Sequence, residues 1–135
     1  DLTVIACGSC AFQALQAANF MDSSDGLKIR VLNMHTIKPI DREAVTKALM
    51  DTRRIITVED HTVIGGLGSA VAEVIVESGK GCAFKSLGIP DKFAPIGLHE
   101  DIMSILGIDS NGIIEAIREV MGKDFEVDDD WTDEV

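Results

Sequence analysis

The best candidate for chemistry in this 135-residue chain is a polar cluster followed by a glycine-rich turn. Glu59, Asp60 and His61 come directly after a short apolar run, and a glycine-rich turn begins four residues later. Exposed amides in such a turn, together with the dipole of a following helix, can seat an anion. The sequence therefore predicts an interface or anion-binding loop made of Glu59, Asp60, His61, Gly65, Gly66, Gly68 and Ser69.

The rest of a nucleotide-binding signature does not accompany this turn. A dinucleotide fingerprint requires a third glycine where Val71 stands, and an acidic residue near position 86 to hold a ribose. No Gly-Lys-Ser or Gly-Lys-Thr sequence follows the turn. The alternative is that the glycines let a helix and a strand pack closely, and we favour this explanation over a dinucleotide site.

A second motif, Cys7-Gly8-Ser9-Cys10, lies between a predicted strand and a predicted helix. A helix N-terminus lowers the pKa of a nearby thiol, so this spacing is compatible with thiol redox chemistry. The flanking alanines do not resemble a thioredoxin-like site, and no later proline supplies an opposing loop. Small residues packing at a strand–helix turn are the alternative, which leaves a thiol oxidoreductase as the weaker hypothesis.

The three histidines do not complete a recognisable site. A carboxylate beside His61 could orient its imidazole for proton transfer, but no nucleophile or second base is placed near it. His35 and His99 are far from it in sequence, and neither they nor the cysteines have zinc-ligand spacing. We therefore assign no catalytic, cofactor-binding or metal-binding residue to this chain.

The elements that position these residues alternate between strand and helix. Apolar runs at 3–6, 29–34, 55–58 and 82–87 predict strands, and helical patterns occupy 11–21, 41–50, 69–78, 100–106 and 110–121. Apolar strands joined by helical crossovers form a mainly parallel sheet that helices cover on both faces. The predicted fold is therefore an α/β protein, a three-layer α/β/α sandwich.

Charge and composition define the domain and exclude some partners. Seven acids follow the last cation, Lys123, so 1–123 is predicted as the folded domain and 124–135 as an acidic, disordered tail. A net charge of −11 argues against nucleic-acid binding, and no apolar run is long enough for a membrane span. Three cysteines suit a cytoplasmic protein. The start at Asp1, without an initiator methionine, suggests an excised domain.

Three blocks in order carry a family resemblance. Residues 33–41 (NMHTIKPID), 57–61 (TVEDH) and 65–73 (GGLGSAVAE) closely resemble the C-terminal domain of transketolases. Residues 87–93 (LGIPDKF) extend the likeness, which covers about residues 2–121. The CxxC motif departs from the family, whose members usually have a small and a polar residue there.

The resemblance implies the third domain of a thiamine diphosphate enzyme. The first two domains, or a separate amino-terminal subunit, would bind thiamine diphosphate and Mg, and none of the cofactor would be bound by this domain. The resemblance further implies a homodimer or heterotetramer and a sheet order of 2-1-3-4. It also implies that the predicted loop lies at a dimer interface or at the substrate entrance. A stand-alone anion- or metabolite-binding regulatory module remains the alternative.

Overall fold

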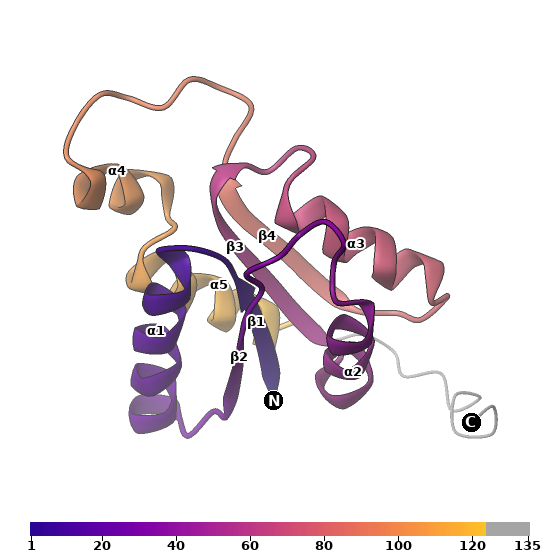
Figure 1. Ribbon diagram of the computed structural model, residues 1–135. Coiled ribbons are helices and arrows are strands. Elements are labelled where there is room, and N and C mark those ends of the chain that lie inside the picture. The colour runs from indigo at the N-terminus through magenta and orange to yellow at the C-terminus, as the bar shows by residue number, and fades with distance from the viewer. Residues whose placement is uncertain (124–135) are drawn as a thin grey trace.

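The computed structural model describes residues 1–123, and the predicted acidic tail at 124–135 lies outside the described residues. A four-stranded sheet forms the centre of the molecule (Figure 1). Its strands are β1 (Leu2–Ala6), β2 (Ile29–Asn33), β3 (Arg54–Thr62) and β4 (Ala83–Ile89). All neighbouring pairs are parallel and the order is β2-β1-β3-β4, which confirms the predicted sheet.

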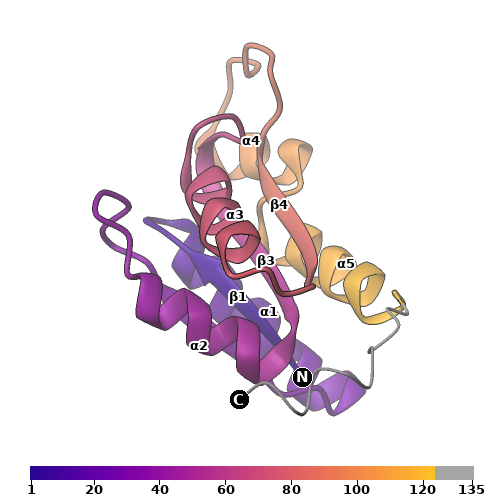
Figure 2. The same cartoon turned by 90° about the vertical axis from the view of Figure 1, so that its right-hand side faces the viewer.

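Helices cover both faces of the sheet, so the predicted three-layer sandwich is correct (Figures 1 and 2). One face carries α1 (Cys10–Asp25) and α5 (Ser110–Met121), with the short α4 (His99–Leu106) beside α5. The other face carries α2 (Arg42–Thr52) and α3 (Leu67–Glu77). Among residues 1–123, no helix combines the length and the apolar character that a membrane crossing requires.

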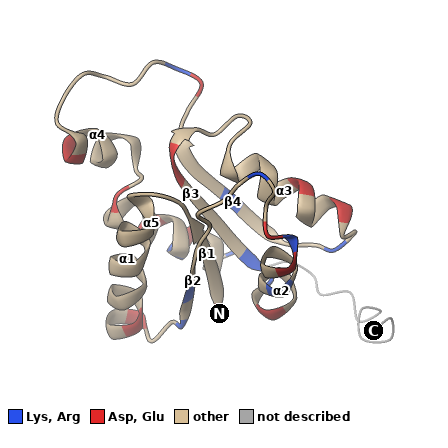
Figure 3. Ribbon diagram, viewed as in Figure 1, with Lys and Arg blue, Asp and Glu red and all other residues tan. Residues whose placement is uncertain are grey.

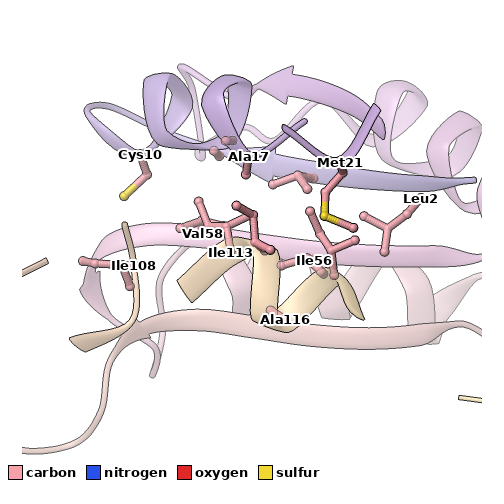
Figure 4. Packing of buried hydrophobic residues seen from close by; sticks show 14 of the residues in the cluster. Leu2, Cys10, Ala17, Met21, Ile56, Val58, Ile108, Ile113 and Ala116 are labelled. Carbon is pink, nitrogen blue, oxygen red and sulfur yellow. The ribbon is translucent and has the colours of Figure 1, made fainter. Parts of the chain in front are cut away.

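The two faces of the sheet enclose separate hydrophobic cores. Side chains alternate along β1, so Leu2, Val4 and Ala6 contact the α1/α5 core while Ile5 contacts the α2/α3 core. Figure 4 shows the first of these cores, where residues from α1, β3 and α5 meet with no polar side chain among those labelled. The packing of both cores fixes the strand register, because a slip of one residue would move each β1 side chain into the core on the opposite face.

Several element boundaries differ from the sequence prediction. Strand β3 continues to Thr62, four residues beyond the predicted end at 58, with an irregularity in its pairing to β4 between Val58 and Thr62. Strand β2 is only partly buried, since it lies at the edge of the sheet. The end of β3 is held by backbone pairing and by the side chain of Glu59, whereas the apolar pattern that predicted the strand stops at Val58.

Helices α2 and α3 begin and end as their local sequences dictate. The side chain of Asp41 accepts a hydrogen bond from the amide of Ala44 and so caps α2. In α3, Val71, Val74 and Ile75 are buried and Glu73 is exposed. Helix α3 starts two residues earlier than predicted, at Leu67. The glycine-rich turn is therefore short, and it places the amides at the start of α3 next to the end of β3.

Candidate functional site

A cleft of ≈440 Å³ lies at the carboxyl edge of the sheet. Strand β1 leads into α1 on one face and β3 leads into α3 on the other, so the chain diverges between these neighbouring strands. Open α/β sheets bind ligands in the crevice at such a switch point. The lining residues are Cys7, Gly8, Ser9, Ile37, Glu59, Asp60, His61, Gly65 and Gly66.

Glu59 binds the start of α3 with both carboxylate oxygens. Its Oε1 accepts a hydrogen bond from the amide of Leu67, and its Oε2 accepts one from the amide of Gly68, both at 2.8 Å. The side chain is 1% exposed. A carboxylate at a helix N-terminus satisfies amides that have no partner within the helix, and it is attracted by the helix dipole. The amides that could seat an external anion at this turn are therefore engaged by a carboxylate of the chain itself.

The glycines of the turn make room for this carboxylate. A Cβ atom at Gly66 would lie 1.9 Å from Oε1 of Glu59, and one at Gly68 would lie 2.9 Å from Oγ1 of Thr57. Gly88, on β4, is equally restricted, since a Cβ there would lie 2.8 Å from the backbone oxygen of His61. The packing explanation of the glycine turn is thus supported at Gly66 and Gly68 by direct steric need.

Ser69 and Gly65 hold the loop in place. The amide of Gly65 donates to Oγ of Ser69 at 2.9 Å, and this hydroxyl donates to the carbonyl of Val63 at 3.3 Å. Gly65 has a φ of 76°, which a side chain would disfavour. Gly65 lines the cleft, whereas Gly68 and Ser69 do not, and Ser69 acts on the cleft only through its hydrogen bond with Gly65.

His61 lines the cleft, and its ring is held by the backbone. Its Nδ1 lies 2.7 Å from the carbonyl oxygen of Thr62 and 3.5 Å from Oε1 of Glu59. A carbonyl only accepts, so Nδ1 carries the proton and Nε2 is the acceptor in the neutral ring. The predicted orientation of His61 by a carboxylate is therefore secondary to its bond with the Thr62 carbonyl. The side chain is 59% exposed.

Asp60 makes a contact that sequence reasoning missed. Its Oδ2 lies 3.8 Å from Nδ1 of His99, at the first residue of α4. Gly8, Ser9 and Ile37 also line the cleft although they were not predicted as site residues. All three follow β1 or β2, and the strand order identifies the carboxyl ends of β1 and β3 as neighbours. That order was therefore the signal that could have placed Gly8 and Ser9 in the site.

The surroundings of the two cysteines of the CxxC motif disfavour the thiolate form. Burial, followed by the negative charges of Glu59 and Asp60, raises the pKa of the Cys7 thiol. Burial, followed by the charge of Asp60, raises the pKa of Cys10 to about 12. Figure 4 shows Cys10 pointing from α1 toward the layer that holds Val58 and Ile108. Burial and the nearby carboxylates thus outweigh the stabilisation of a thiolate that is expected from the helix N-terminus. The motif fits the alternative that its small residues pack at a strand–helix turn.

No cluster of three or more metal-ligating side chains occurs among residues 1–123. The carboxylates of Glu59 and Asp60 make the cleft acidic, and no Lys or Arg lines it. An acidic cleft of this kind favours a cationic or neutral occupant over a phosphate.

Comparison with known proteins identifies the family. Residues 1–113 match the family model described as "Transketolase, C-terminal domain". The chain is 41% identical over 123 residues to a subunit of the apulose-4-phosphate transketolase of Phocaeicola vulgatus, covering 91% of this chain and 38% of that protein. It is 37% identical over 128 residues to the 1-deoxy-D-xylulose-5-phosphate synthase of Halothermothrix orenii, covering 94% of this chain and 20% of that protein.

A solved structure agrees with this assignment. The chain is similar to "Split gene transketolase, inactive beta4 tetramer", with a TM-score of 0.82 and 33% identity over 90% of this chain and 39% of that one. The chain thus spans between a fifth and two fifths of the length of these relatives. On its fold and on its sequence, the chain belongs to the transketolase C-terminal domain family.

Proposed function

We propose that this chain is the C-terminal structural and interface domain of a transketolase, which transfers a two-carbon ketol unit between sugar phosphates with thiamine diphosphate. The observation that carries the proposal is the 41% identity to a transketolase subunit, of which this chain covers 38%. The match of residues 1–113 to the transketolase C-terminal domain agrees with it. The missing part of the enzyme would be amino-terminal domains or a separate amino-terminal polypeptide. The complete enzyme would be a homodimer or heterotetramer in the cytoplasm.

The described residues do not fit a diphosphate cofactor. The amides at the start of α3 would be the natural place for a diphosphate, but Glu59 already accepts hydrogen bonds from Leu67 and Gly68 there. A second anion at this position would meet the negative charge of Glu59 and find the amides engaged. Thiamine diphosphate and Mg would therefore bind to the amino-terminal part, and we expect the isolated domain to have no transketolase activity.

A coupled assay tests the proposal. Ketol transfer is measured for this chain alone, for the amino-terminal part alone, and for the two together, each with thiamine diphosphate and Mg. Because relatives are named for an apulose phosphate and for 6-deoxy-6-sulfo-D-fructose, the substrate panel includes phosphorylated and sulfonated sugars. Activity in the mixture alone supports the proposal, whereas turnover by this chain alone rejects the structural role.

A second candidate is the C-terminal domain of a 1-deoxy-D-xylulose-5-phosphate synthase. It is favoured by the matches of 37% and 39% identity to such synthases from Halothermothrix orenii and Geobacter sulfurreducens. The two candidates differ in product, so the same assembled enzyme is tested for formation of 1-deoxy-D-xylulose 5-phosphate. Formation of that product without ketol transfer between sugar phosphates would replace the transketolase assignment.

A further inference from the structure

The segment between β4 and α4 is unusually exposed. Every residue from 90 to 101 is exposed, and the relative exposure of Phe93 is 101% and that of Ile96 is 105%. Figures 1 and 2 show this segment arching away from the sheet before it returns to α4. Within the described chain, its backbone hydrogen bonds are confined to its two ends. The fold of this domain therefore gives these side chains nothing to pack against.

Apolar exposure continues into α4. Leu98 is 75% exposed and Ile105 is 70% exposed. The end of the loop lies on α4, since a Cβ at Gly97 would be 3.6 Å from Ile102. Scattered exposed apolar residues are normal on a protein surface, but large ones gathered on one short segment indicate an interaction site.

The same segment carries unpaired negative charge. Asp91, Glu100 and Asp101 make no ion pair with any residue from 1 to 123, and Lys92 is the one cation between 90 and 105. Asp60 adjoins this group through His99. Figure 3 shows these acidic positions in red at the end of β3, on the loop and at the start of α4. The apolar side chains thus have an acidic border.

We infer that this surface docks onto an apolar area bordered by Lys and Arg side chains on the amino-terminal part of the same enzyme. The inference rests on the proposed function, because it requires that part to exist. We name the surface the loop–α4 surface, and it consists of Phe93, Ile96, Leu98 and Ile105 with Asp60, Asp91, Glu100 and Asp101.

The negative charge of the loop–α4 surface distinguishes between its possible binding partners. In a two-fold contact between copies of this domain, each acidic border would face another acidic border, which opposes self-association through this surface. An anionic lipid surface would be repelled in the same way. A partner with basic residues around an apolar area satisfies both features, since it buries Phe93 and Ile96 and neutralises the carboxylates that have no partner here.

Photo-crosslinking in the assembled enzyme tests the inference. The photoreactive residue p-benzoylphenylalanine replaces Phe93, and in a control it replaces Val76, which is 77% exposed on α3. Peptides joined on irradiation are identified by mass spectrometry. We expect position 93 to crosslink to a Lys- or Arg-containing peptide of the amino-terminal part, and position 76 not to reach that peptide. Crosslinks from position 93 to another copy of this domain, or to no other region, would overturn the inference.

Charge reversal supplies a second readout. Glu100→Lys with Asp101→Lys should lower the crosslink yield from position 93 by about fivefold at low salt, and less at high salt, because opposite charges attract across an interface. The control is Glu73→Lys with Glu115→Lys, two exposed acids on other helices. A yield unchanged by the first pair would contradict the proposed border. Because crosslink yield needs no turnover, an enzyme that crosslinks as predicted but transfers no ketol unit would reject the proposed function alone.

Discussion

Oε2 of Glu59 lies 2.8 Å from the amide nitrogen of Gly68, and Oε1 lies at the same distance from the amide of Leu67. One buried carboxylate at the end of β3 thus joins the sheet to the first turn of α3. Both oxygens act as acceptors, and neither could be replaced by a donor without setting an N–H group against an amide N–H.

Glu59→Gln should therefore destabilise the fold. The substitution removes the charge and turns one acceptor into a donor beside an amide, which we expect to cost about 2 kcal/mol of unfolding free energy. Urea unfolding followed by circular dichroism measures this cost. Glu73→Gln is the control, since Glu73 is exposed on α3, the helix that Glu59 binds. Its unfolding free energy should change by no more than about 0.5 kcal/mol. Equal unfolding midpoints for the two variants would show that the carboxylate contributes nothing.

Gly66→Ala should destabilise the fold, although it adds only one methyl group. The new methyl group would lie 1.9 Å from Oε1 of Glu59, so either the carboxylate or the turn must move. We expect a loss of about 2–3 kcal/mol, as for other overpacked buried sites. Gly81→Ala is the matched control, because nothing lies within 4 Å of its Cβ position. Thermal unfolding compares the two, and a Gly66 variant as stable as the Gly81 variant would contradict the steric argument.

Much of this arrangement was predictable from the sequence, and the rest was not, for physical reasons. Alternating apolar runs identified the four strands, and Asp41 marked the start of α2 through local capping chemistry. The role of Glu59 depends on amides eight and nine residues away, across a turn whose geometry no periodicity encodes. The contact between Asp60 and His99 spans 39 positions and arises only when α4 returns to the carboxyl edge.

The exposure of the loop–α4 surface was also beyond sequence reasoning. The sequence predicts an irregular stretch around Pro90 and Pro95, because no apolar periodicity passes through it. It does not say whether Phe93 packs inward or faces water. That depends on whether the domain offers a neighbouring core, and the described residues offer none to it.

Two buried threonines on neighbouring strands should respond oppositely to the same substitution. Oγ1 of Thr57 has no hydrogen-bond partner among the described residues, whereas Oγ1 of Thr3 lies 3.1 Å from Oγ1 of Thr52. Both side chains are fully buried. Thr57→Val should therefore stabilise the fold by up to about 1 kcal/mol, and Thr3→Val should destabilise it by about 1 kcal/mol.

Chemical unfolding of each threonine variant measures its change in unfolding free energy, so the two changes can be compared directly. Valine matches threonine in shape, so the comparison isolates the hydroxyl group. If Thr57→Val lost as much unfolding free energy as Thr3→Val, the hydroxyl of Thr57 would have a partner that we have not assigned.

The buried thiols should make the fold sensitive to alkali. The pKa of Cys10 is raised to about 12 and that of Cys82 to about 11, both chiefly by burial, from an ordinary value of 9.0. Above pH 9 the unfolded chain releases these protons while the folded chain keeps them. The unfolding free energy contributed by each thiol is therefore fully present below pH 9 and falls as pH rises toward the folded pKa, by up to about 1.4 kcal/mol per pH unit.

Urea titrations between pH 8 and 11 measure this dependence. Cys10→Ala should flatten it, although the variant starts less stable by about 1 kcal/mol because it leaves a small cavity in the α1/α5 core. Iodoacetamide gives an independent reading, since alkylation of Cys10 at pH 8 should occur only through unfolding and should speed up in proportion to the unfolded population. Rapid alkylation of folded protein at pH 8 would instead show an accessible thiolate, and would restore the thiol oxidoreductase hypothesis for the CxxC motif.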